Sequence, residues 1–261
     1  MALLTFVEAR RTVEQQVSSA RRLPEAETVA LAQAAGRILA EPVAADRDYP
    51  PFPRATRDGY AVRAAETPGR LRVMGQIRAG QEFPGAVQLG EAVEIMTGAP
   101  VPAGADAVIM VEFTRREGEA VVLERGVHNG ENIVPRGSEA AAGAVALEPG
   151  RRIDYPEIAL LASFGRPSVE VYRRPRVAIV STGDEVVEIS DTPGGCQIRN
   201  SNAWSLAAQV RRAGAEPVVL PIAPDEKTRT RELVERGLET DLLLLSGGVS
   251  MGQYDLVEAV L

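Results

Sequence analysis

Two segments of the sequence place hydroxyl groups and acids directly after an apolar run. Arg176-Val-Ala-Ile-Val-Ser-Thr-Gly-Asp-Glu185 and Asp241-Leu-Leu-Leu-Leu-Ser-Gly-Gly-Val-Ser-Met-Gly-Gln-Tyr-Asp255 both change from aliphatic residues to a turn that contains glycine. In parallel α/β sheets, ligands bind outside the carboxyl ends of the strands, and glycine lets backbone N–H groups approach an anion closely. The two segments therefore predict a site for a phosphate or a similar oxyanion.

Four acids follow the expected strand ends: Asp184, Glu185, Asp225 and Asp255. Carboxylates repel one another and a bound anion, and Mg²⁺ resolves this repulsion because it binds carboxylate and phosphate oxygens together. Each feature also has a structural interpretation. Asp225 and Asp255 are suitable helix N-caps, residues 182–185 suit a polar turn, and residues 246–250 suit a tight turn between a strand and a helix.

The composition excludes several kinds of site. The 261-residue chain has 29 basic and 36 acidic residues, and its net charge of −7 argues against a nucleic-acid surface. With one cysteine and one histidine, a disulfide framework, a zinc site and a histidine-based triad are excluded. No Walker loop or dinucleotide-binding fingerprint occurs. No apolar run approaches the roughly 20 residues of a membrane span, and the N-terminus lacks signal-peptide features, so we expect a cytoplasmic protein.

The first forty residues predict helices. Thr5 and Glu8 form a capping box before an apolar face, and a second helix is expected over Leu31 to Leu39. Prolines then prevent helix, so a boundary is expected close to Asp46. From residue 60 to about residue 134, short β-type runs separated by Gly, Pro and charged turns predict a small all-β domain: 70–76, 93–96, 107–113 and 120–123.

Helical signals return at residues 154–157, where a second capping box precedes a helix over residues 158–164 that Gly165 ends. Strands are expected on both sides of this helix, at residues 144–147 and 168–172. The N-terminal helices are too short to be stable alone, so we expect them to pack against this returning segment. The first domain is then discontinuous, with the β block inserted.

After residue 175, strands and helices alternate regularly. Continuous apolar strands between helices predict a parallel, doubly wound sheet with right-handed crossovers. A sheet of three strands exposes long unpaired edges, so we expect the natural domain to continue beyond Leu261 and the sequence to be truncated. The expected strands are 176–180, 217–221 and 241–245, and the expected helices are 202–213, 228–238 and one that starts at Asp255.

Two turns of the β block are further candidates. Asp58 lies in Arg57-Asp-Gly-Tyr-Ala61, and Thr97 begins a compact loop that extends to Asp106. Both have a structural interpretation, as a plain Asp-Gly turn and as loop packing. Three residues are assigned no role and are interpreted as a loop histidine, a buried or idle thiol and a helix-core residue: His128, Cys196 and Trp204.

Six segments, taken in order, resemble the MoeA family of molybdopterin molybdenumtransferases, to which the E domain of gephyrin and its plant counterpart are related. The resemblance covers nearly the whole chain. It rests on Ala35-Gly-Arg-Ile-Leu-Ala40, Pro50-Pro-Phe52, Asp58-Gly-Tyr-Ala61, Thr97-Gly-Ala-Pro-Val-Pro-Ala-Gly-Ala-Asp106, Ser181-Thr-Gly-Asp-Glu185 and Ser246-Gly-Gly-Val-Ser-Met-Gly252.

The resemblance implies a multidomain fold of the α/β plus all-β class. It comprises a discontinuous α+β dimerisation domain (1–46 and 135–172), an inserted small β domain (47–134) and an incomplete three-layer α/β, parallel-sheet molybdopterin-binding domain (173–261). The complete family fold adds a C-terminal β-barrel and forms an elongated homodimer.

The resemblance also implies an activity. Family members insert molybdate into adenylylated molybdopterin with Mg²⁺ and release AMP, a step of molybdenum cofactor biosynthesis. The same resemblance places Asp58 and Thr97 in the active site of the partner subunit. Since later family segments are missing, we expect this chain alone to have little or no activity. The implied metal and pyrophosphate ligands are Glu185, Asp225 and Asp255, and the implied contacts of the pterin phosphate end are Thr182, Gly183, Asn202, Ser246, Gly247, Gly248 and Ser250.

Two other functions stay open. A scaffold module would hold molybdopterin or a partner protein without turnover, and it would not need three carboxylates beside an anion loop. A phosphatase or nucleotidyl-transfer enzyme would hydrolyse ATP regardless of molybdate. The leading expectation is a Mg²⁺-dependent transferase that acts as a homodimer on adenylylated molybdopterin and molybdate, without nucleic-acid or membrane partners.

Overall fold

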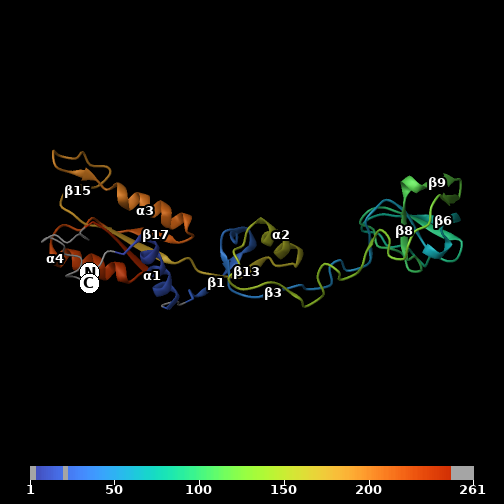
Figure 1. Cartoon of the computed structure of the whole chain (residues 1–261), viewed down its shortest axis with the longest axis horizontal. Helices are drawn as coiled ribbons and strands as arrows, with labels where there is room; N and C mark the ends of the chain where they lie inside the picture. The colour runs from blue at the N-terminus through green and yellow to red at the C-terminus, as the bar shows by residue number, and fades with distance from the viewer. Residues whose placement is uncertain (1–3, 20–22, 248–261) are drawn as a thin grey trace. The chain divides into compact units, whose positions relative to one another are not determined.

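The computed structural model describes residues 4–19 and 23–247. The chain separates into two compact units. Figure 1 shows the ribbon coloured along the sequence from blue at the N-terminus to red at the C-terminus. The first unit contains Met1–Glu41, Pro149–Ile158 and Pro167–Leu261, and the second contains Pro42–Glu148 and Ala159–Arg166. The finer division into three domains with limits at residues 46, 134 and 172 stays a prediction.

The first unit contains a small antiparallel sheet with the strand order β1-β13-β2. The central strand β13 (Ser168–Tyr172) pairs along its whole length with β1 (Ala26–Ala30) and at its end with β2 (Ile38–Leu39). Val169 and Val171 are buried. The N-terminal segment therefore joins the returning segment through strand pairing and not through helix packing.

The helix expected over Leu31 to Leu39 is wrong. Leu31–Gln33 form only a short 3₁₀ segment, η1, after which the chain enters β2. Gly36 has a φ of 76°, a left-handed conformation that ends a helix. Leu39 is completely buried where it pairs with Val171, so tertiary pairing with β13 overrides the helical pattern.

Both expected capping boxes start a helix. In α1 (Phe6–Ser19), the N–H of Thr5 donates to Glu8 Oε2 at 2.8 Å and the N–H of Glu8 donates to Thr5 Oγ1 at 3.4 Å. In α2 (Tyr155–Ser163), the N–H of Asp154 donates to Glu157 Oε2 at 2.9 Å. No helix in the described ranges is long and apolar enough to cross a membrane.

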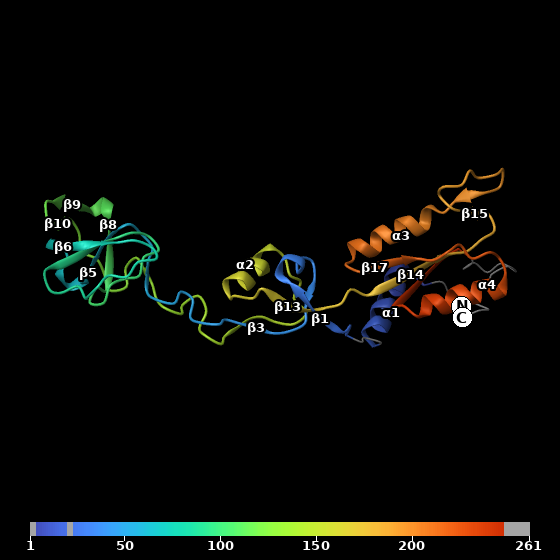
Figure 2. The same ribbon diagram turned by 180° about the vertical axis from the view of Figure 1, so that it is seen from behind.

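A parallel sheet with the order β17-β14-β18 also belongs to the first unit, as the alternating sequence pattern predicts. Val177 and Ile179 of the central strand pack with α3, whereas Ala178 and Val180 pack with α4. The two helices therefore cover opposite faces of the sheet, as Figure 1 and Figure 2 show from opposite sides. Strands β15 (Val186–Val187) and β16 (Ile198–Arg199) form a separate two-stranded sheet. The elements of the parallel sheet and its helices are β14 (Arg176–Ser181), α3 (Ser201–Arg212), β17 (Glu216–Val219), α4 (Lys227–Leu238) and β18 (Leu242–Ser246).

The second unit contains a sheet with the order β8-β5-β7-β6-β10-β9. Tyr60 and Val62 are buried in one apolar cluster and Ala61 in another, so β5 has a core on both faces. The expected helix from Asp255 lies outside the described residues. The remaining elements are β3 (Val43–Ala44), β4 (Arg54–Ala55), β5 (Gly59–Val62), η2 (Ala64–Glu66), β6 (Gly69–Ile77), β7 (Glu91–Ile95), β8 (Ala107–Met110), η3 (Val111–Phe113), β9 (Thr114–Glu117), β10 (Ala120–Leu123), β11 (Ile133–Val134) and β12 (Val145–Leu147).

Candidate functional site

The loops that follow the three parallel strands meet at the carboxyl edge of the sheet. The N–H of Thr182 donates to the carbonyl of Ser246 at 2.9 Å, and the N–H of Gly183 donates to the carbonyl of Ala223 at 3.0 Å. The loop after β14 thus lies between the loops after β17 and β18. The structure brings together Thr182, Gly183 and Ser246, the residues that the sequence places at an oxyanion site.

A pocket of about 110 Å³ opens at this edge and is lined by residues 181–182, 185–186, 198–202 and 246–247. Asn202, one of the predicted ligand contacts, donates from its side-chain amide to Ser246 Oγ at 3.1 Å. Sites for whole small molecules are usually larger, about 300 Å³ or more. The part of the pocket that the described residues line has room for one end of such a ligand.

Thr182 carries a buried hydroxyl at this pocket. The residue is 6% exposed, and its Oγ1 has no hydrogen-bond partner among the residues that the structure describes. A buried polar atom that stays unpaired costs about 1–3 kcal/mol. A ligand oxygen or N–H that pairs with this hydroxyl would remove that cost, so Thr182 is suited to ligand contact.

Asn200 organises the wall of the pocket, and the sequence interpretation missed it. It is 4% exposed and caps α3, where its Oδ1 accepts from the N–H of Ala203 at 3.2 Å. The same oxygen accepts from the hydroxyl of Ser181 at 2.9 Å. The signal in the sequence is an asparagine directly before a helix, which is a preferred N-cap.

Gly247 is required by the turn geometry itself. Its φ is 97°, and a Cβ at this position would lie 2.6 Å from the carbonyl oxygen of Thr182. Gly183 has a φ of 130° and lies beside the Glu185 carboxylate, where a Cβ would come within 2.3 Å of Oε2. The structural interpretation of these glycines therefore holds, and it is compatible with ligand binding.

Two of the predicted acids are linked across the strand ends. Asp184 Oδ1 accepts a hydrogen bond from the N–H of Asp225 at 3.0 Å. The alternative interpretation of Asp225 as the cap of α4 is wrong, because the cap is Glu226 and no side chain bonds there. Asp184 thus positions the backbone that carries Asp225.

The side-chain atoms available as metal ligands at this edge are of the kind that Mg²⁺ binds. The described acids and hydroxyls offer only oxygen atoms, which Mg²⁺ prefers as ligands. Within residues 4–19 and 23–247, no group of three metal-binding side chains comes together. Glu185 lines the pocket and Asp225 follows the neighbouring strand, whereas Gly248, Ser250 and Asp255 lie outside the described residues.

Asp58 and Thr97 contact each other in the second unit. Asp58 Oδ1 accepts from the N–H of Thr97 at 2.6 Å and from its hydroxyl at 2.7 Å. The backbone hydrogen bond, followed by the side-chain hydrogen bond, holds the pKa of Asp58 below its ordinary value. The two residues that the sequence singles out in the β block therefore form one hydrogen-bonded pair.

The single tryptophan is not a core residue. Trp204 is 48% exposed, because the buried face of α3 is formed by Ala203, Ala207 and Val210. Cys196 is exposed, so it is not a buried thiol, and His128 lies exposed in a loop, as the sequence predicts.

Two domain families match the chain. The MoeA N-terminal region (domain I and II) matches residues 4–165, and the probable molybdopterin binding domain matches residues 178–261. The two matches together include every described residue named at the candidate site.

Several curated relatives are named molybdopterin molybdenumtransferase. The protein of a Nostoc species is 40% identical over 245 residues, which are 91% of this chain and 56% of the relative. The Bacillus subtilis protein is 40% identical over 248 residues, or 90% of this chain and 58% of the relative. The chain therefore spans little more than half the length of the curated relatives it matches.

A solved structure shares the mixed α/β fold. The molybdopterin biosynthesis MoeA protein from Pyrococcus horikosii matches with a TM-score of 0.82 and 33% identity, and the match covers 96% of this chain and 65% of that chain.

Proposed function

The chain belongs to the MoeA family, and we propose that it serves the insertion of molybdenum into molybdopterin as a molybdopterin molybdenumtransferase. The observation that carries this proposal is the meeting of three strand-end loops, where Thr182 bonds to Ser246 and Asp184 bonds to Asp225. Such an edge offers backbone donors, hydroxyls and carboxylates to a phosphate-containing ligand. The names of the relatives supply the identity of that ligand.

The chain's own residues would bind and orient the phosphate end of the pterin. Ser201 and Asn202 line the pocket in the first turn of α3, where the partial positive charge of the helix favours an anion. The Thr182 hydroxyl and Ser246 would donate hydrogen bonds to the same group. Asn200 would keep this wall in place by fixing Ser181 and the start of α3.

Glu185, Asp225 and Asp255 would hold Mg²⁺. When bound, the ion neutralises charge on the phosphoanhydride and polarises it for hydrolysis. Asp184 would keep Asp225 in position through the backbone bond. Asp58 and Thr97 would complete the active site from a second copy of the chain, so the proposal includes a homodimer.

Helix α1 carries an exposed apolar stripe that a second copy of the chain would cover. Phe6, Val13 and Val17 recur at helical spacing and are 80%, 61% and 64% exposed. Light scattering during size-exclusion chromatography measures the mass of the protein in solution and so distinguishes a dimer from a monomer. We expect a dimer that dissociates in Phe6→Glu and persists in Arg11→Glu on the same helix, and a monomeric wild type would remove this part of the proposal.

The test of function measures AMP released from adenylylated molybdopterin with Mg²⁺ and molybdate by a protein of the curated relatives' full length, because the 261-residue chain alone is expected to have little or no activity. Equilibrium dialysis measures binding of the same pterin to the 261-residue chain in parallel. We expect Thr182→Val to weaken binding about tenfold, the equivalent of one hydrogen bond to a charged group. Asp225→Ala should abolish Mg²⁺-dependent AMP release, and Glu235→Ala on α4 serves as the control.

A scaffold function without turnover gives a different result. The chain would then bind the pterin equally with and without Mg²⁺, and Asp225→Ala would bind as the wild type does. ATP hydrolysis that is indifferent to molybdate would instead favour an unrelated phosphatase. Either pattern contradicts the transferase proposal.

A further inference from the structure

A second, larger pocket lies in the first unit at the opposite end of the parallel sheet. Its volume is about 370 Å³, which falls in the range of small-molecule sites. The lining residues are 23–24, 36–38, 150, 152, 172–175 and 213–215. Residues 172–175 precede β14, whereas the candidate site follows β14, so the two pockets are separate.

Backbone hydrogen bonds fix the walls of this pocket. The N–H of Arg173 donates to the carbonyl of Glu25 at 2.9 Å, and the N–H of Ile153 donates to the carbonyl of Arg37 at 2.9 Å. The N–H of Glu216 donates to the carbonyl of Pro175 at 2.8 Å. These bonds tie the main chains of the segments that line the pocket, or of residues next to them.

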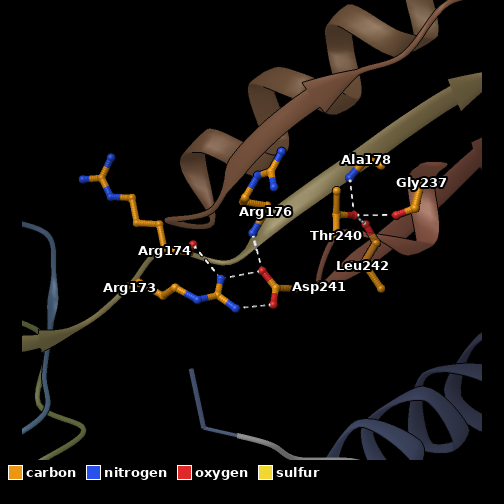
Figure 3. Close-up of polar contacts among 8 residues, drawn as sticks. All are labelled: Arg173, Arg174, Arg176, Ala178, Gly237, Thr240, Asp241 and Leu242. Carbon is orange, nitrogen blue, oxygen red and sulfur yellow. Dashed lines mark hydrogen bonds and ion pairs between the residues drawn. The ribbon is translucent and has the colours of Figure 1, made fainter. Parts of the chain in front are cut away.

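Among the described residues, the charged side chains of the lining are all arginines: Arg37, Arg152, Arg173 and Arg174. Two of them are neutralised, since Arg37 pairs with Glu27 and Arg173 pairs with Asp241. Arg152 and Arg174 are exposed and make no side-chain hydrogen bond or ion pair within the described part of the chain. Figure 3 shows the Arg174 side chain extending away from the Arg173–Asp241 pair.

The rest of the lining is mostly apolar. Leu23, Ile38, Tyr172 and Pro175 contribute carbon surface, and Gly214 leaves space near the end of α3. The Nε of Arg37 is also buried here without a partner among the described residues. An apolar body would remove carbon surface from water, and one negative group would pair with the two free guanidinium groups.

We propose that the pocket formed by Arg152, Arg174 and the apolar side chains of Leu23, Ile38 and Tyr172 binds a small organic monoanion, a carboxylate or sulfonate with an apolar body. The ligand would contact the connection between β13 and β14 and the segment 150–152. A ligand there bridges the small antiparallel sheet and the parallel sheet.

8-Anilinonaphthalene-1-sulfonate is a suitable probe, because it has an aromatic body and one sulfonate. Trp204 is the only tryptophan and lies on α3. The helix rises about 1.5 Å per residue, so energy transfer from Trp204 reports a probe bound beyond the end of α3. We expect saturable, one-site transfer that weakens with salt.

Charge-removing variants test the site. Arg152→Gln combined with Arg174→Gln should weaken the probe about tenfold or more, because two charge-assisted contacts are lost. Arg11→Gln combined with Arg231→Gln removes the same charge from exposed positions and should leave the affinity unchanged. Thr182→Val, at the candidate site, should also bind the probe normally.

Thermal unfolding of each variant checks the fold, and these exposed arginines should not alter it. Probe binding that is absent, or that is unchanged in the Arg152/Arg174 double variant, overturns the proposal. Equal weakening in the Arg11/Arg231 control would show attraction by net charge and would overturn it as well.

Discussion

Arg173 and Asp241 form a two-point ion pair at the amino edge of the parallel sheet. Arg173 Nη1 lies 2.7 Å from Asp241 Oδ2, and Nη2 lies 2.6 Å from Oδ1. The N–H of Arg176 also donates to Oδ2, at 2.7 Å (Figure 3). One carboxylate therefore joins the start of β14, the start of β18 and the connection from β13.

This carboxylate should make stability depend on pH. The hydrogen bonds from Arg173 and then Arg176 lower the pKa of Asp241 from 3.8 to about 2. A carboxyl group with a depressed folded-state pKa stabilises the fold above its unfolded-state pKa, and this contribution is lost as the pH falls through the folded-state pKa. The contribution of Asp241 is therefore complete above about pH 4 and decreases toward pH 2.

Asp241→Asn isolates that contribution. We expect the variant to be less stable than the wild type at neutral pH, and the difference to shrink as the pH approaches about 2. Urea unfolding at several pH values measures it, and Glu235→Gln on α4 is the control for loss of an exposed acid. Parallel stability curves for the wild type and Asp241→Asn would contradict the role of the ion pair.

Thr97→Val should raise the pKa of Asp58. The substitution removes the hydroxyl donor and preserves the shape, while the backbone N–H of Thr97, the larger cause of the lowered pKa, remains. The pKa of Asp58 should therefore rise but stay below its ordinary value. Carboxyl ¹³C shifts against pH measure it, and Thr114→Val, whose hydroxyl donates to the Val111 carbonyl, is the control. An unchanged pKa would show that the Thr97 hydroxyl bond is absent in solution.

The parallel sheet could be predicted from the sequence because its signals are local. Aliphatic runs alternate with helical patterns, and β14 is buried along residues 177–181 as a central parallel strand requires. The helix predicted over Leu31 to Leu39 failed because the deciding contact is distant. Leu39 pairs with Val171, and no periodicity within residues 31–39 contains that information.

Part of the candidate site could also be predicted from the sequence, and part could not. Turn residues that follow a strand mark its carboxyl edge, so Thr182 and Ser246 could be identified directly. Asn200 was missed because its role depends on Ser181, which lies in another element. The contact between Asp184 and the N–H of Asp225 likewise depends on which strands are neighbours.

Gly59→Ala should destabilise the second unit strongly. A Cβ at Gly59 would lie 1.9 Å from the carbonyl oxygen of Ile109, so the pairing of β5 with β8 must shift. We expect a loss of about 3 kcal/mol or more of unfolding free energy. Gly126→Ala is matched within the same unit, because its Cβ would meet atoms only at 3.7 Å, and it should change stability by less than about 0.5 kcal/mol. Denaturant unfolding measures both variants, and equal stabilities would refute the close approach of Gly59 to β8.

Asn200→Ala should destabilise the first unit and loosen the start of α3. The variant loses the N-cap and leaves the Ser181 hydroxyl unpaired in a buried position, because Asn200 Oδ1 serves both. Loss of an N-cap costs about 1 kcal/mol, and an unpaired buried hydroxyl adds about 1–3 kcal/mol. Asn202→Ala is the control, since it removes only an exposed bond to Ser246. Unfolding free energy gives the cost, and hydrogen exchange at Ala203 locates it. If Asn200→Ala and Asn202→Ala were equally stable, with the Ala203 amide equally protected, Asn200 would not hold this wall of the pocket.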